Sequence, residues 1–142
     1  MFKTTDFRNM FKQDIENIFA DYYDEINTEI QVIYDNEQEM TFPCCYIEIL
    51  NPISADRYND GSDNYNYRDF SLSCELYSKD TDINRKDAVL NYADILINEI
   101  LKKYTTFSVT QNQPLPYKTD VARRVVRFTG TVDTKNKRLY NN

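Results

Sequence analysis

Histidine is absent from this sequence of 142 residues, and glycine occurs only twice. Without histidine, neither a histidine-dependent catalytic triad nor a zinc site of the HExxH kind can form. Gly61 and Gly130 are far apart, so the glycine-rich loops that bind nucleotide phosphates are absent as well. We therefore expect a protein that is not an enzyme, with no catalytic residues, no bound metal and no cofactor.

Cysteine is scarce and membrane-type segments are missing. Cys44, Cys45 and Cys74 are an odd number of thiols, and none has CxxC spacing. We expect them to be reduced and buried or half-buried. No apolar run of about 20 residues and no secretory signal pattern occurs, so we expect no membrane span and synthesis in a cytoplasm-like compartment.

Charge is unevenly distributed along the chain. Residues 1–117 hold 10 basic and 21 acidic side chains, whereas residues 118–142 hold 7 basic and 2 acidic ones. The two parts therefore carry net charges of −11 and +5, which sum to the formal charge of −6. This balance argues against sequence-specific nucleic-acid binding, and it places opposite charges on different parts of one molecule.

The periodicity of apolar residues predicts the fold. Apolar residues recur every three or four positions in two segments, which indicates two amphipathic helices, and β-branched or alternating segments indicate strands. Together these predict an α+β two-layer sandwich, a mostly antiparallel sheet of about five strands with both helices on one face. We expect one domain over residues 1–134 and a polar C-terminal tail over 135–142. The predicted helices are 4–23 and 84–104, and the predicted strands are 29–34, 44–50, 67–78, 107–110 and 121–133.

Three expectations concern details of this sheet. The strands 29–34 and 44–50 are expected to be antiparallel neighbours, and Pro114 and Pro116 are expected to break the chain after the strand 107–110. In the strand 67–78, one face is expected to be core and the other exposed or at an interface. The three cysteines are divided between the two faces of their strands, because Cys44 and Cys45 are adjacent.

The arginines of the last long strand are the main candidates for an interface. In 121–133, alternation predicts that Arg123 and Arg127 face outward with Val125 and Thr129, while Arg124 lies on the core face, either near an edge or with its charged end extended to solvent. Three interpretations remain open: pairing with the strand acids Glu48 or Glu75, contact with an acidic surface of a neighbouring copy, or nucleic-acid contact. Arginine suits contact with a neighbouring copy, because it forms bidentate pairs and is weakly hydrated. The side chains expected to face the core are Ala122, Val126, Phe128 and Val132.

The segment 51–66 and the start of the next strand supply a second candidate. Tyr58, Tyr65 and Tyr67 stand among asparagine, aspartate and serine, a mixture typical of adaptable recognition loops. A solvated loop is the alternative. An EF-hand calcium loop fails here, because Tyr58 and Tyr67 occupy positions that require oxygen ligands.

The order of the elements resembles that of phage tail terminator (tail completion) proteins. The resemblance covers nearly the whole chain and begins with the amphipathic helix at the start. It continues with FPCCYIEI (42–49), a long loop leading into RDFSLSCELYS (68–78), the helix DAVLNYADILINEIL (87–101) and, after a proline-bearing loop, VARRVVRFTGTVD (121–133).

The resemblance implies a structural virion protein. Such a protein forms a ring, here expected to be a homohexamer, at the head-proximal end of the tail tube, ends tube polymerisation and joins the tube to the head–tail connector. Its partners would be itself, the tail tube protein and the connector, with DNA free to pass through the ring. It would be made in the host bacterial cytoplasm and reside in the virion.

Three other functions compete with this one. The first is a head-side connector or stopper protein that joins head and tail in the same kind of particle. The second is a non-viral adaptor protein of a mobile element. The third is a metal-dependent nuclease that uses some of the 23 acidic residues.

Overall fold

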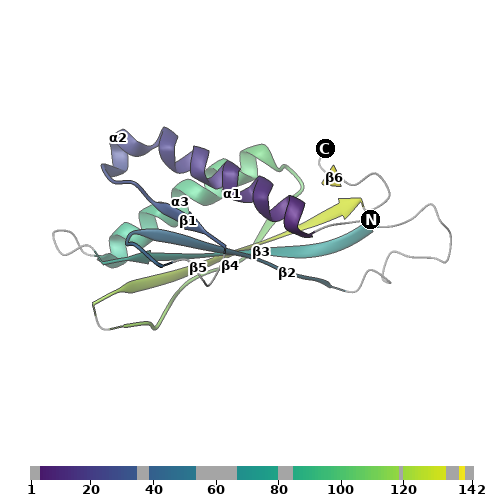
Figure 1. The fold of residues 1–142 in the computed structure, drawn as a ribbon. Coiled ribbons are helices and arrows are strands. Elements are labelled where there is room, and N and C mark those ends of the chain that lie inside the picture. The colour runs from purple at the N-terminus through teal and green to yellow at the C-terminus, as the bar shows by residue number, and fades with distance from the viewer. Residues whose placement is uncertain are drawn as a thin grey trace.

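The fold is a sheet with helices on one face. The computed structural model describes residues 4–34, 39–53, 67–79, 85–118, 120–133 and 138–139. Helices α1 and α3 lie side by side over one face of the sheet (Figure 1), which confirms the predicted α+β sandwich. The elements are α1 (Thr4–Asp21), α2 (Tyr23–Ile26), β1 (Gln31–Ile33), β2 (Cys44–Ile53), β3 (Tyr67–Ser78), α3 (Arg85–Lys103), β4 (Ser108–Leu115), β5 (Ala122–Asp133) and β6 (Arg138–Leu139).

Both long helices pack through the stripes that the sequence predicts. In α1, residues Phe7, Phe11, Ile15 and Phe19 are buried, because spacings of three and four place them on one side of the helix. In α3 the buried side chains have the same spacing and belong to the same core cluster: Ala88, Val89, Tyr92, Ala93, Ile95, Leu96 and Ile100. Helix α1 is shorter than the predicted helix 4–23, because the chain turns at Tyr22 and starts the short helix α2.

The sheet has the strand order β1-β2-β3-β5-β4, with β6 paired to β5. The prediction that the first two strands are antiparallel is wrong: β1 pairs with β2 in parallel. The Gln31 side chain binds the chain that leads into β2, since its amide donates to the Glu39 carbonyl (3.2 Å) and accepts from the Thr41 N–H (2.8 Å). These bonds hold the entry to β2 beside the start of β1, so the two strands run in the same direction. The other pairings are antiparallel.

The prolines do not end β4. The strand was expected to stop at residue 110, but it continues to Leu115 and includes Pro114, which pairs in register with Arg124. β4 is an edge strand of the sheet path, and an edge strand tolerates proline because one row of its N–H groups needs no partner. β2 likewise runs past residue 50 to Ile53, with a register shift between Leu50 and Ile53. β6 falls inside the segment expected to be a polar tail.

Aromatic rings join the helix layer to the sheet. Phe11 contacts the rings of Phe70, Tyr104 and Phe107, with centroid separations of 5.9, 5.6 and 6.0 Å. Gly130 of β5 lies against the Phe107 ring. A Cβ atom at Gly130 would come within 2.5 Å of Phe107 Cε1. Only glycine leaves room for this ring against the strand.

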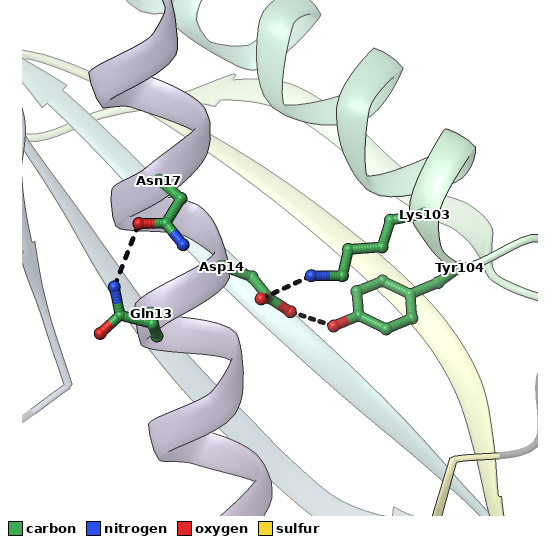
Figure 2. A network of polar contacts seen from close by, with 5 residues as sticks. All are labelled: Gln13, Asp14, Asn17, Lys103 and Tyr104. Atoms are coloured by element: carbon green, nitrogen blue, oxygen red, sulfur yellow. Dashed lines mark hydrogen bonds and ion pairs between the residues drawn. The ribbon is translucent and has the colours of Figure 1, made fainter.

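A polar clamp connects α1 to the end of α3 (Figure 2). The hydroxyl of Tyr104 donates a hydrogen bond to Asp14 Oδ2, and Lys103 Nζ donates to Asp14 Oδ1 at 2.7 Å. Burial and the bond to Asp14 raise the pKa of the Tyr104 hydroxyl, which keeps this group a donor. The Asp14 side chain is only 11% exposed, and the Tyr104 residue is buried as well, so this hydrogen bond is shielded from water.

We expect Asp14→Ala to lower the free energy of unfolding by about 1–3 kcal/mol, because it leaves the buried Tyr104 hydroxyl without its acceptor. Urea denaturation followed by circular dichroism would measure this. Gln13→Ala is the matched control, since among the described residues Gln13 bonds to Asn17 on the exposed side of the same helix (Figure 2). An equal loss in both variants would contradict the role of the clamp.

Candidate functional site

The face of the sheet opposite the helices is the candidate functional site. Figure 1 shows α1, α2 and α3 on one side of the sheet, and the described part of the chain places no helix on the other. We call this surface the open face. Its side chains alternate with those of the core along β2, β3, β5 and β4. By register, its central rows are Tyr46, Glu75, Val125 and Gln113, and then Glu48, Ser73, Arg127 and Gln111.

The open face has a low, shielded floor. Ser73 is 5% exposed and Val125 is 2% exposed, although both point away from the helices. The register sets Ser73 between the longer side chains Glu48 and Arg127, which shield it. Val125 was expected to face outward, and it does so by register, but it is buried there. We call Ser73 and Val125 the floor of the open face. These side chains are small or apolar, whereas Glu48 and Arg127, on either side of Ser73, are charged.

Arg123 is paired within the chain. Its Nη2 donates to Glu75 Oε1, and the two side chains are 27% and 18% exposed. The bond to Glu75 raises the pKa of the Arg123 guanidinium. Of the interpretations of the outward arginines, pairing with a strand acid is thus confirmed for Arg123 and Glu75. This pair fixes one border of the open face.

Arg127 differs from Arg123 in its lack of an ion pair. The Nε atoms of both arginines are shielded from solvent and have no hydrogen-bond partner within the described residues, but Arg123 bonds Glu75 through its Nη2. Glu48, the other acid proposed as a partner, is exposed, and no ion pair between Glu48 and Arg127 is found among the residues the structure describes. Arg127 is therefore a partly shielded cation on the open face whose Nε donor is still unused.

Arg124 lies on the other side of β5, as expected for its position. Its Nε donates to Asn112 Oδ1 of β4 at 2.7 Å, and register places Pro114 beside it. The guanidinium thus reaches the β4 edge of the sheet instead of entering the core. This confirms the expectation that Arg124 lies near an edge.

A small second core covers one end of the open face. Cys44, Tyr77 and Val121 are buried there and pack against Met40 and Phe42. Burial raises the pKa of the Tyr77 hydroxyl. The sequence pattern placed Tyr77 on the exposed face of β3 and did not reveal this cluster. The signal lay in Met40 and Phe42, two large apolar residues just before β2 that belong to neither helix stripe.

The three cysteines are free and fully buried, as expected. Burial raises the pKa of the Cys44 thiol to about 12, and the hydrogen bond with Cys74 together with burial raises that of Cys45. Since thiolates are the reactive species, we expect native protein at pH 8 not to react with an aromatic disulfide reagent within minutes. In denaturant all three thiols should react. Rapid release of one equivalent from native protein would show that a cysteine is accessible.

The remaining candidates are only partly described. Tyr58 and Tyr65 lie outside the described residues, and Tyr67 is seen as the first backbone position of β3, in register with Asp133. Among the residues that are described, no group of three or more possible metal ligands lies together. No helix in this part of the chain has the length and apolar character needed to cross a membrane.

The chain matches no protein-family model and no curated protein.

Proposed function

We propose that this protein is a ring-forming structural subunit of a phage tail, which ends the tail tube and joins it to the head connector. The order of elements supports this, since it resembles that of the tail terminator proteins. The observation that carries the proposal is the open face: a sheet surface with a shielded floor and with Arg127, for which the described residues provide neither an ion pair nor an acceptor at Nε.

Such a surface suits protein contact more than solvent exposure. A shielded donor without an acceptor costs about 1–3 kcal/mol, and a carboxylate or carbonyl of a partner protein would remove that cost at Arg127. Arginine is also enriched where interfaces have their largest binding contributions. Because Ser73 and Val125 are already covered by their neighbours, a partner would contact the longer side chains around them, Glu48 and Arg127 among them.

The mechanism would be steric and interfacial, without a catalytic step. A closed ring requires that one patch of each subunit meets a different patch of the next, and the charge separation between residues 1–117 and 118–142 supplies opposite charges for this purpose. The open face then binds the end of the tube. Tube growth stops because the ring presents to incoming subunits a surface unlike the tube end.

The test is electron microscopy of the purified protein combined with mass measurement by light scattering. Rings, and a mass of several subunits at low salt, are the expected result. A monomer at high concentration and low salt would contradict the proposal. Binding to tubes of the tail tube protein, and not to the head-side connector alone, separates a tail terminator from a head-side stopper.

A further inference from the structure

A basic groove lies at the β4 edge of the sheet. It has a volume of about 670 Å³ and is formed by the start of α3, the end of β4 and the start of β5. Leu90 and Tyr117 contribute exposed apolar surface, at 39% and 43% exposure. The basic side chains of the lining are Lys86, Lys118, Arg123 and Arg124, against the single carboxylate of Asp87; Arg123 is already paired with Glu75.

An acidic corner lies where α1 meets α2. Tyr23 is 45% exposed there, and the acidic residues Asp21, Asp24, Glu25 and Glu29 around it are all exposed. A hollow of about 420 Å³ adjoins Tyr23, with Phe19, Ala20 and Ile30 among its lining residues. The corner therefore combines an aromatic side chain, an apolar hollow and four negative charges.

The two surfaces complement each other in charge and in apolar content. Within the described ranges, the large apolar side chains that remain exposed are Tyr23, Leu90 and Tyr117, and all three belong to these two surfaces. An exposed apolar group ringed by charge marks a protein contact more often than a solvated surface. Opposite charges on the two surfaces would favour their encounter and fix its orientation.

The fold places the two surfaces on opposite edges. The acidic corner leads directly into β1 through Glu29 and Ile30, and the groove is built on β4. In the sheet order β1-β2-β3-β5-β4, these strands are the first and the last of the path. One molecule therefore cannot easily bring its own corner to its own groove, but a neighbour placed edge to edge can.

We infer that the basic groove of one molecule binds the acidic corner of a second copy of this chain. Tyr23 of the second copy enters the groove against Leu90 and Tyr117, while Asp24 and Glu25 approach Lys118 and Arg124. The contact joins two different surfaces, so it is heterologous and leaves a free groove and a free corner at the two ends of every pair. This inference rests on the proposed function in one respect: it identifies the contact between subunits of the ring.

The test uses two variants that each lose one surface. In the corner variant, Tyr23→Ser, Asp24→Asn and Glu25→Gln remove the anchor and two charges. In the groove variant, Leu90→Ser and Lys118→Gln remove an exposed apolar side chain and one positive charge from the other surface. All five positions are exposed, so both proteins are expected to fold, which circular dichroism would check. Gln13→Ala, which changes an exposed side chain of α1 that lines neither the groove nor the hollow, is the matched control.

We expect each variant alone to be monomeric in light scattering, and the control to assemble like the natural sequence. The two variants mixed should form a one-to-one dimer, because one still has the groove and the other the corner. Loss of the aromatic anchor should weaken self-association at least ~30-fold. The dimer should weaken as salt rises, since the charges involved are exposed.

The outcomes separate this inference from the proposed function. If both variants still assemble as the control does, the contact is refuted, while rings in the microscope would leave the function standing. If the mixed variants dimerise but the natural sequence forms no rings, the contact stands and the ring function fails. Reconstitution by mixing also shows that neither variant is simply unfolded. A mixture that stays monomeric beside an assembling control would overturn the inference.

Discussion

Phe11→Ala is expected to lower the free energy of unfolding by about 3–5 kcal/mol, the range measured for removal of a buried aromatic ring. Phe11 is 0% exposed, and its ring meets Phe70 of β3 and both Tyr104 and Phe107 beyond α3. The substitution therefore removes apolar burial and three ring contacts, while the contacts of Phe107 with Phe70 and Tyr104 remain. It acts where the helix layer meets the sheet.

Such a loss is a large share of the stability of a domain, which is typically about 5–15 kcal/mol. Urea denaturation at low protein concentration would measure it, so that self-association does not add to the apparent stability. Met10→Ala is the control, because Met10 precedes Phe11 in α1 and is only half-buried. We expect Met10→Ala to cost clearly less. Equal losses would mean that the aromatic cluster has no special weight in the core.

The helices and the central strand were predictable from the sequence because their signals are local. The apolar spacing of α1 and α3 is set by 3.6 residues per turn, and the alternation in β3 by the two-residue repeat of a strand. β3 indeed spans residues 67–78 as expected. These patterns need no knowledge of what packs against them, so local periodicity alone located them.

The errors concern properties that depend on distant partners. The direction of β1 relative to β2 follows from contacts of Gln31 with the chain before β2, and no periodicity reports them. Pro114 continues β4 because that strand is at an edge of the sheet, a property of the topology and not of the proline. The burial of Val125 and Tyr77 on the open face arises from neighbours brought in by other strands.

The candidate site was predictable only in part, for the same reason. Alternation along β5 correctly placed Arg123 and Arg124 on opposite faces of the sheet, because the face on which a strand residue lies is set locally. The choice of partner is not local: Glu75 lies beside Arg123, whereas no ion pair joins Glu48 to Arg127 among the described residues. The basic groove is formed by three separate segments of the chain, so no single stretch of sequence could predict it.

Under the proposed function, Arg127→Ala is expected to weaken binding of the protein to tail tubes by ~30-fold or more, equivalent to about 2 kcal/mol. Arg127 lies in the centre of the open face between Ser73 and Gln111 by register. Its shielded Nε has no acceptor within the described residues, so a partner acceptor there would gain a charge-assisted hydrogen bond. The alanine variant loses that bond while the paired Arg123 and Glu75 remain.

Co-sedimentation of purified rings with tubes of the tail tube protein would measure this effect, with light scattering to record ring mass. Arg127→Lys tests the geometry, because lysine keeps the charge but lacks the Nε donor, so we expect a partial loss of binding. Arg8→Ala is the matched control: Arg8 Nε is also shielded without a partner among the described residues, but Arg8 lies on α1, where its guanidinium stacks on Tyr34. Equal loss in Arg8→Ala would exclude a specific role of the open face. A fall in ring mass in Arg127→Ala would instead place the open face between subunits, and the edge-to-edge contact would then no longer be enough to build the ring.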